Sequence, residues 1–472
     1  LSLVEDHDGA IWAGTNGAGL HRYDSRTDAF DRFTFDPSDP QSIRDDNVLN
    51  LLVTRDGVLW VGTYGGLARR YPLSQVVARE AVRPGDATSL SSNDVTAFAE
   101  GPDGVVWVGT SGGGLNRRDP AAGSFSHVVV DPSAPSTLGS ERVFDVAVDA
   151  GGAVWASTYA GLYRGEPGGR PFERFLAPED EAGIGVIFPL AEANGDVWGG
   201  GTGVLAIDAA TMRTDRYPLS SRFERVSIDA RALLLDPEGD VWVGTYEGLF
   251  RLDPEARAWA RVPLDPEEER FNSRPEITGL ARTASGAVWV GTGDGLYRLE
   301  GEGPEISRIH RSDGLPNTDV TDLAIDRLGR LWVLTVAGLS IRDPATGRFV
   351  SYGPADGLGG GQALYRRLRS ERMYVGTPRG YRVVDPATLG AERPLPTPVL
   401  TGIRGDGEAV RTGVERALPD RALATADPIR MRPGSRVVTL GFAVLDFRAP
   451  GTHRYSVSLV GFDPALRDIG SQ

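Results

Sequence analysis

Residues 109–113 come closest to a known catalytic pattern. They read Gly-Thr-Ser-Gly-Gly and match Gly-x-Ser-x-Gly. In that pattern a serine on a sharp strand-to-helix turn is the nucleophile, and its acidic and histidine partners follow later in the chain. The position of Ser111 recurs elsewhere as Asn16, Tyr64 or Tyr246. Because the register repeats without the serine, the segment indicates a β-turn, and we predict no catalytic residue.

The composition also argues against metal and cofactor chemistry. The chain has no Cys and no Lys, so all 50 positively charged side chains are Arg. This excludes thiolate nucleophiles, phosphate-loop lysines and Schiff-base lysines. Acidic stretches at 36–39 and 265–269 lack the spacing of a calcium loop and are more typical of turns. We predict no metal site and no cofactor, since the histidines show no paired ligand spacing: His7, His21, His127, His310 and His453.

A variable position offers a better candidate for ligand binding. Tyr64, Tyr159 and Tyr246 all follow a threonine that closes an apolar segment. Aromatic and arginine side chains are enriched among residues that dominate binding energy. With residues on nearby connecting segments, the ligand-binding candidates are Tyr64, Tyr159, Tyr246, Arg142, Arg222, Phe223, Asn272 and Arg274.

The element that must position these residues is a repeat marked by tryptophan. Successive markers are 42 to 48 residues apart, and Tyr374 replaces Trp in a ninth unit. A Gly lies three residues before each Trp. Each unit holds about four short apolar segments, which is the period and content of a β-propeller blade. The marker residues are Trp12, Trp60, Trp107, Trp155, Trp198, Trp242, Trp289 and Trp332. We expect them to pack between blades rather than to bind ligand.

Strand order predicts where the loops lie. The first strand of a blade ends at an Asp-Gly turn such as Asp103-Gly104, for which we expect a tight turn whose central residues have positive φ. The second strand returns to the opposite face. The residue after its Thr therefore shares a face with the long links between blades. Loops held by a rigid scaffold are where binding residues usually lie.

The bulk numbers define the class of protein. The chain has 472 residues and a formal net charge of −14, which argues against nucleic acid as a partner. It has no run of 18 apolar residues and no signal peptide, and we expect it to be a fragment of a longer protein.

The repeat stops near residue 391. A proline-rich linker follows at 394–398. Short segments come after it and suggest a β-sandwich, and the alternation of polar and apolar residues is clearest at 453–459. Counting seven blades back from Tyr374 reaches Trp107. We therefore predict an all-β chain with the last blades of an upstream propeller at 1–75, a seven-bladed propeller at 76–390 and a partial immunoglobulin-like sandwich at 391–472. A single propeller of eight or nine blades is the alternative.

These residues resemble a known family. The units at 42–70 and 89–117 look like the two-component regulator propeller repeat, and the tail around Tyr455, Gly461 and Phe462 is similar to a Y_Y_Y domain. The usual tryptophan after that tail is absent, so the sandwich is expected to be truncated. The resemblance implies the periplasmic sensor of a membrane-bound hybrid histidine kinase or diguanylate cyclase.

What the resemblance implies for function is a non-catalytic sensor region. It would bind a small molecule or oligosaccharide, form a homodimer through the sandwich and reach the membrane only through a downstream helix. It would relay the ligand signal to a cytoplasmic output. The alternatives are a secreted propeller enzyme, such as a lyase or glycosidase, and a protein-interaction scaffold.

Overall fold

The computed structural model describes most of the chain in short stretches. It covers residues 2–7, 9–24, 28–37, 42–54, 57–70, 77–134, 136–169, 171–177, 190–193, 196–201, 203–219, 230–237, 239–265, 275–300, 305–309, 313–315, 317–353, 356, 358, 365–367, 372–377, 380–389, 398–405, 408–409, 438–444, 455–457 and 467–470. The chain divides into two compact units. One is Leu73–Ala391, and the other combines Leu1–Pro72 with Glu392–Gln472.

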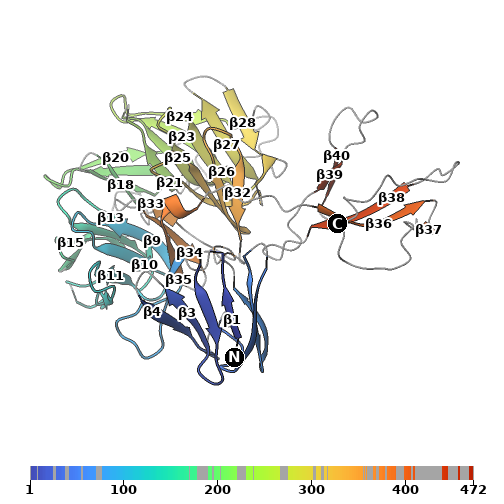
Figure 1. Cartoon of the computed structure of the whole chain (residues 1–472). Helices are drawn as coiled ribbons and strands as arrows, with labels where there is room; N and C mark the ends of the chain where they lie inside the picture. Colours follow the sequence, from blue (N-terminus) through green and yellow to red (C-terminus); the bar gives the residue numbers. More distant parts are fainter. Residues whose placement is uncertain are drawn as a thin grey trace. The chain divides into compact units, whose positions relative to one another are not determined.

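The unit Leu73–Ala391 consists of four-stranded antiparallel sheets, seven of which are described (Figure 1). Its strands are β8 (Val77–Glu80), β9 (Val95–Glu100), β10 (Val106–Thr110), β11 (Leu115–Arg118), β12 (Phe125–His127), β13 (Val143–Val148), β14 (Val154–Thr158), β15 (Gly161–Gly165), β16 (Phe172–Leu176), β17 (Leu190–Ala193), β18 (Asp196–Gly200), β19 (Gly203–Ile207), β20 (Thr214–Pro218), β21 (Ala230–Leu235), β22 (Val241–Thr245), β23 (Gly248–Asp253), β24 (Ala258–Val262), β25 (Ile277–Arg282), β26 (Val288–Thr292), β27 (Gly295–Glu300), β28 (Glu305–Ile309), β29 (Val320–Ile325), β30 (Leu331–Thr335), β31 (Gly338–Arg342), β32 (Phe349–Tyr352), β33 (Tyr365–Arg367), β34 (Met373–Thr377) and β35 (Gly380–Val384).

The first strands of these sheets form a closed ring. Contacts run in order from β9 through β13, β17, β21, β25 and β29 to β33, and β33 contacts β9 again. The predicted all-β propeller is therefore confirmed. We number the blades one to seven from the sheet that begins with β9.

Blade seven is completed by a strand from the start of the unit. β33, β34 and β35 come from residues 365–384, and the fourth strand is β8, whose Val77 pairs with Val384. Glu80 of β8 also binds Arg118 of blade one, with 3.0 Å between Oε1 and Nη2. The pairing of β8 with β35 thus gives blade seven its fourth strand and joins the two ends of the unit.

The turn between the first two strands of a blade differs from the expected one. The Gly101 N–H donates to Val105 O and Gly104 N–H donates to Gly101 O, so the loop has three residues. Gly104 has a φ of +77°, whereas Asp103 is not among the residues with positive φ. This is a type I turn followed by a left-handed glycine, not the two-residue turn that Asp-Gly suggests.

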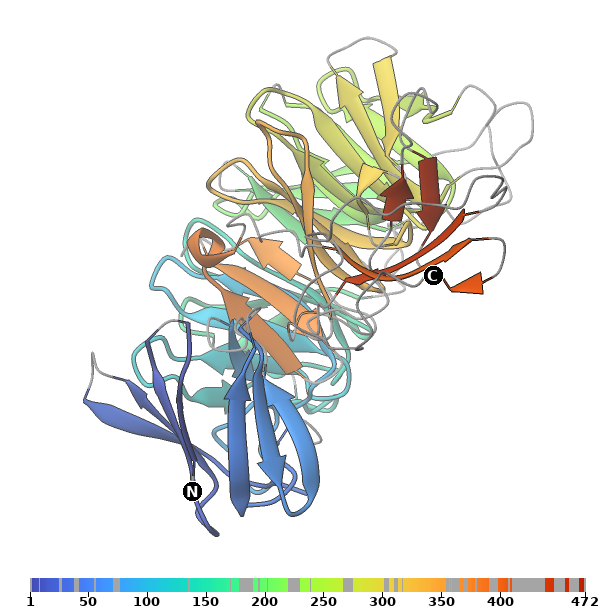
Figure 2. The same ribbon diagram turned by 45° about the vertical axis from the view of Figure 1, so that its right-hand side comes forward.

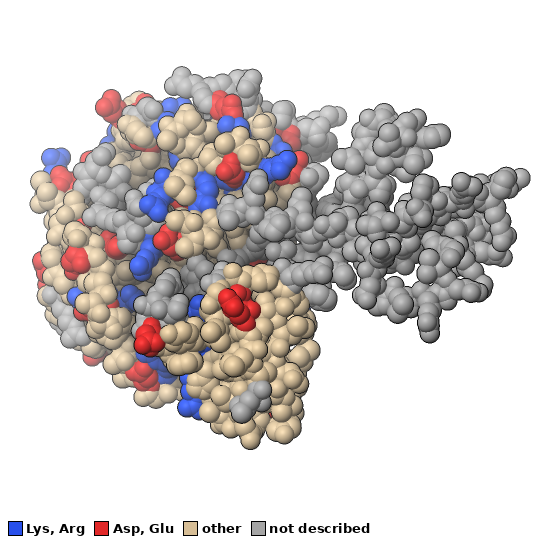
Figure 3. Space-filling model, viewed as in Figure 1, with Lys and Arg blue, Asp and Glu red and all other residues tan. Residues whose placement is uncertain are grey.

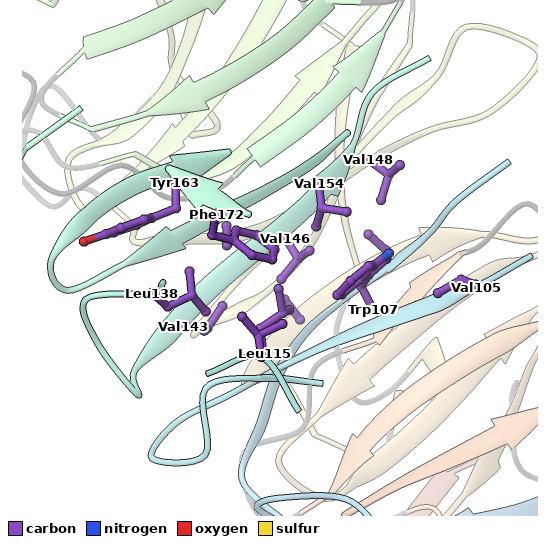
Figure 4. Close-up of a cluster of buried hydrophobic side chains, with 14 residues drawn as sticks. Val105, Trp107, Leu115, Leu138, Val143, Val146, Val148, Val154, Tyr163 and Phe172 are labelled. Carbon is purple, nitrogen blue, oxygen red and sulfur yellow. The ribbon is translucent and has the colours of Figure 1, made fainter. Parts of the chain in front are cut away.

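The repeat tryptophans pack between blades, as predicted. Trp107 of blade one is 3% exposed and packs with Val146 of blade two (Figure 4). Its ring lies 6.3 Å from that of Phe172, edge to face. In several blades an aspartate six residues earlier accepts the indole N–H. The Trp155 Nε1–Asp149 Oδ2 distance, for example, is 3.0 Å.

The stretch Leu1–Pro72 forms two further sheets that pack on each other around Trp12 and Val61. Their strands are β1 (Ser2–Glu5), β2 (Ile11–Gly14), β3 (Leu20–Asp24), β4 (Ala29–Phe33), β5 (Val48–Val53), β6 (Leu59–Thr63) and β7 (Gly66–Arg70).

The outward faces of these two sheets are apolar and uncovered. Leu3 and Ile11 are 74% and 43% exposed on the first sheet, and Leu52 and Leu67 are 61% and 63% exposed on the second. Leu115, at the position of Leu67 in blade one, is fully buried. Figure 3 accordingly shows a broad surface with few charged side chains over this stretch.

The stretch Glu392–Gln472 holds a three-stranded and a two-stranded sheet. Their strands are β36 (Pro398–Gly405), β37 (Glu408–Ala409), β38 (Val438–Val444), β39 (Tyr455–Val457) and β40 (Arg467–Gly470) (Figure 2). The β-sandwich expected at residues 391–472 stays a prediction. Within the described ranges no helix has the length and hydropathy needed to cross a membrane.

Candidate functional site

The tips of the hairpins between the second and third strands are built by threonine. Thr158 ends β14, is fully buried, and donates its hydroxyl to Gly161 O at 2.9 Å. Thr245 makes the same bond to Gly248 O, also at 2.9 Å. The bond holds the hairpin closed and leaves the next residue at the tip. Tyr159 and Tyr246 are consequently 65% and 45% exposed, although the threonine before each of them is buried.

The links between blades lie on the same face as these tips, as predicted. The Tyr159 N–H donates to Arg142 O at 3.2 Å, and Gly114 N–H of blade one donates to Glu141 O at 2.8 Å. Ser111 also forms an isolated bridge with Arg142. We call the surface formed by residues 111, 141–144, 159, 231, 246 and 276 the link face.

Arg142 and Phe144 form the first cluster on the link face. The Arg142 guanidinium carbon lies 5.3 Å from the centroid of the Phe144 ring, within reach of a cation–π interaction. Arg142 precedes β13, and Phe144 is the second residue of that strand. The backbone bond from Tyr159 places the tip of the same blade beside them. Blade two therefore presents an exposed arginine, a half-buried ring and an exposed phenol together.

Arg231, Tyr246 and Glu276 form the second cluster. The guanidinium carbon of Arg231 in β21 lies 4.9 Å from the centroid of the Tyr246 ring. Its Nη2 is 3.3 Å from Glu276 Oε1, on the link that precedes β25. Both charged side chains remain more than a third exposed. The cluster thus offers guanidinium donors, a carboxylate and an aromatic ring to solvent.

The predicted candidates lie in different parts of the structure. It brings Arg142 and Tyr159 together and places Tyr246 in the second cluster, whereas Tyr64 belongs to the other compact unit. The remaining candidates lie outside the described residues: Arg222, Phe223, Asn272 and Arg274.

Phe144, Arg231 and Glu276 were missed by the sequence reasoning. A signal for Phe144 and Arg231 exists. Both are the second residue of a first strand, where blades one, five and six carry threonine, as at Thr96 and Thr278. A threonine there bonds the next blade, as in Thr278 Oγ1 to Val320 O at 2.6 Å. The position therefore varies among the blades, and in blades two and four it carries Phe144 and Arg231 in place of the threonine.

Ser111 does not lie on a strand-to-helix turn. It follows β10 in a β-hairpin that continues into β11, and its N–H donates to Asp94 O at 2.8 Å. The β-turn prediction is confirmed.

The histidine and acidic side chains were also compared with the ligand sets of metal sites. His127 has its Nε2 2.9 Å from the carbonyl oxygen of Ser89. No group of three or more His, Asp or Glu suited to a metal ion occurs in the part of the chain that the structure describes.

Carboxylates on the links form turns. The Thr88 hydroxyl and N–H donate to Asp86, and with a bond from Arg83 they lower the pKa of Asp86 to about 2. Ser133 similarly holds the pKa of Asp131 below its usual value. These bonds match the turn chemistry expected for the acidic links. Residues 38–39 and 266–269 lie outside the described residues.

A small cavity lies away from the link face. It measures about 120 Å³ and lies where β15 turns into β16, at the opposite end of the strands from Tyr159. Sites for small molecules are usually several-fold larger. Part of its polar lining is already paired, since Arg164 Nη1 lies 2.9 Å from Glu166 Oε1. We therefore assign the candidate site to the open link face and not to this cavity.

The fold and the repeats define the class of protein. Residues 42–65, 89–112 and 314–337 match the repeat described as two component regulator propeller. Each match covers a link, a first strand and the hairpin that follows it. The propeller part of the family resemblance is thereby confirmed. No curated protein sequence matches the chain.

Solved structures extend this likeness at the level of the fold. The extracellular domain assigned to the hybrid two component system BT3049 from B. thetaiotaomicron has a TM-score of 0.70 and 20% identity. That of BT4673 from the same organism has a TM-score of 0.52 and 18% identity. The matches cover 100% and 99% of this chain but 62% and 63% of those chains. The chain thus spans about three-fifths of the domains that it resembles.

Proposed function

We propose that this chain is the ligand-sensing part of a transmembrane signalling protein, located outside the cytoplasm in the periplasm. It performs no chemistry itself and binds a small molecule or oligosaccharide on the link face. The observation that carries the proposal is the pair of exposed clusters on blades two and four. The matched repeats and the extracellular domains of similar fold support a location outside the cytoplasm and a role in signalling.

The chemistry of the two clusters suits a sugar. Tyr159 and Tyr246 expose ring faces on which the C–H groups of a pyranose can stack, because the π-face of an aromatic ring is electron-rich. Arg142, Arg231 and Glu276 add donors and acceptors for hydroxyl groups. Because each arginine lies over a ring, its orientation is set before ligand binds, which reduces the entropy lost on binding.

Relay to an output requires two states. A ligand can shift an equilibrium only by the difference in its affinity for the two conformations. We propose that residues 391–472 belong to a Y_Y_Y-like sandwich that forms a homodimer. Through it the signal would reach a downstream membrane helix and a kinase or cyclase output.

The test is binding of a glycan panel, measured by thermal shift and then by calorimetry on any hit. Tyr159→Ala and Tyr246→Ala should each weaken binding of a hit roughly 5- to 100-fold, since hot-spot truncations cost about 1–3 kcal/mol. Phe30→Ala is the matched control, because Phe30 is 63% exposed but lies in the other unit. Equal losses in all three variants, or no hit across acidic and neutral glycans, would reject the link-face site.

We further propose that the two sheets of Leu1–Pro72 are the last blades of an upstream propeller. The support is their uncovered apolar faces, which in blades one to seven contact the neighbouring blade. Since the chain has no Cys, Leu67→Cys would carry a single thiol. Thiol labelling should be fast in residues 1–472 and at least tenfold slower in the natural full-length protein. Equal rates in both would reject the proposal.

A further inference from the structure

The turn of blade six carries a buried arginine at a position where most other blades have alanine, valine or aspartate. The position lies four residues after the residue that opens the turn. Arg330 occupies it in blade six and is 8% exposed. A charged side chain is seldom so buried unless it is paired. The residues at this position elsewhere, two before each marker tryptophan or Tyr374, are Ala10, Val58, Val105, Ala153, Asp196, Asp240, Ala287 and the exposed Arg372.

Arg330 binds a segment of chain that is distant in sequence. Its Nη1 donates to Leu389 O, and its Nη2 donates to Pro386 O. Its Nε donates to Asp326 Oδ2 at 2.7 Å, and the same oxygen accepts the Trp332 indole N–H at 2.8 Å. The guanidinium therefore connects the turn between β29 and β30 with residues 386–389.

Residues 385–389 are the exit segment, through which the chain leaves blade seven. They follow β35 and contain the 3-10 helix η4 (Pro386–Thr388), which Asp385 caps through the Ala387 N–H at 2.9 Å. Leu389 is 1% exposed and joins the core that contains Trp332 and Met373. The exit segment thus docks on blade six by one buried leucine and one buried arginine.

We propose that Arg330 is a latch that holds the exit segment on blade six and sets how tightly the propeller is coupled to the chain that follows. β30 begins directly after Arg330 and ends at Thr335. The N–H of the tip residue that follows, Val336, donates to Asp319 O on the link before β29. One strand therefore joins the link-bearing side of the blade to the latch. This role in relay rests on the proposed sensing function, whereas the latch itself does not.

Blade two shows that the turn does not need the arginine. Asp149 accepts Ala153 N–H at 2.9 Å and the Trp155 indole, just as Asp326 accepts Arg330 N–H at 2.9 Å and the Trp332 indole. Arg330→Ala converts the blade-six turn to the blade-two pattern. The buried Asp326 loses the Arg330 Nε–H but keeps the backbone N–H of residue 330 and the Trp332 indole N–H, the two donors that Asp149 has in blade two. The groups left without a donor are the carbonyls of the exit segment.

The test is hydrogen exchange of the whole 472-residue chain. The Leu389 N–H, bonded to Pro386 O, should exchange at least about tenfold faster in Arg330→Ala, because two charge-assisted bonds that hold the segment are lost. Amides of β29 to β31 should keep their rates. Arg327→Ala is the control, since Arg327 lies 3.9 Å from Asp385 on the surface and should change Leu389 exchange less than twofold.

Two results would overturn the latch. One is unchanged exchange at Leu389. The other is equal acceleration of β29 to β31, which would make Arg330 a general core residue. If Arg330→Ala does not fold, Arg330→Lys replaces it, because a lysine keeps the charge near Asp326 but lacks the planar fork that reaches both carbonyls. Glycan binding by Arg330→Ala separates the two proposals, since a latch mutant keeps the affinity of the link face.

Discussion

The turn of blade five offers a stabilising substitution. The indole N–H of Trp289 is buried and finds no acceptor among the described residues. Blades two, four and six place an aspartate six residues before the tryptophan, and blade five has Thr283 there. Thr283 Oγ1 already accepts the Ala287 N–H at 3.1 Å, which is the bond that Asp149 makes to Ala153. Thr283→Asp should keep that bond and add the missing acceptor.

The expected gain follows from two opposed contributions. A buried donor without a partner costs about 1–3 kcal/mol, and a hydrogen bond to a charged group contributes about 1.5–3 kcal/mol. Moving a carboxylate out of water opposes both. The turn supplies two donors to the new carboxylate, as it does for Asp149, which is 2% exposed. We expect a net gain of about 1 kcal/mol, which raises the Tm by about 2 °C in a unit of this size.

The assay is unfolding in guanidinium chloride followed by tryptophan fluorescence, with calorimetry for the Tm. The reciprocal variant Asp149→Thr is the matched partner, because it turns the blade-two turn into the blade-five pattern. It should lose about 1–3 kcal/mol, as the Trp155 indole loses its acceptor at 3.0 Å. Thr283→Ala should lose less, since it removes only the hydroxyl contacts to Ala287 and Ser285.

The reasoning is refuted if Thr283→Asp destabilises the unit while Asp149→Thr leaves it unchanged. That result would mean that desolvation of the carboxylate exceeds what the indole bond and the turn bond contribute. Opposite signs of similar size in the two variants would support the argument.

Three other outcomes are expected. Leu115→Ala should cost about 2–5 kcal/mol of unfolding free energy, and Leu67→Ala at the same repeat position less than about 0.5 kcal/mol, as measured by denaturant titration. Because its folded pKa is about 2, below the ordinary 3.8, Asp86 stabilises its loop above pH 3.8 and loses that effect as the pH falls through 2. Asp86→Asn should abolish this acid dependence. Titration of the Asp86 carboxyl by NMR is the measurement, and an ordinary pKa for that group would contradict the prediction. Thr158→Val should cost about 1 kcal/mol and speed exchange of the Tyr159 N–H.

Local features of the blades could be predicted because they depend on short segments. The glycine three residues before each marker has positive φ wherever it is described, as at Gly104 and Gly329. The tryptophans are mostly buried, as at Trp155 and Trp332. One unit contains both the turn and the strands that it joins, so spacing alone carries the information. The turn type was mispredicted because the backbone bond from Gly101 N–H to Val105 O makes the loop three residues long, so that only Gly104 takes a positive φ.

The candidate site was predicted only in part. The position after the threonine could be recognised at Tyr159 and Tyr246 because it interrupts a repeat. Arg231 and Glu276 could not, because their 3.3 Å contact joins a first strand to the link of the next blade. The two residues lie 45 positions apart, and which side chains meet across blades depends on the rotation between neighbouring sheets.

The sequence by itself therefore determined the blade: its four strands, its glycine turn and its buried tryptophan, all of which arise from contacts within about 45 residues. The tertiary structure decided how the ring closes and where it ends. β8 pairs with β35 across some 300 residues, and Arg330 reaches Leu389 across 59. Such pairings are set by the number of blades that complete a circle, because only a closed ring brings the two ends of the unit together.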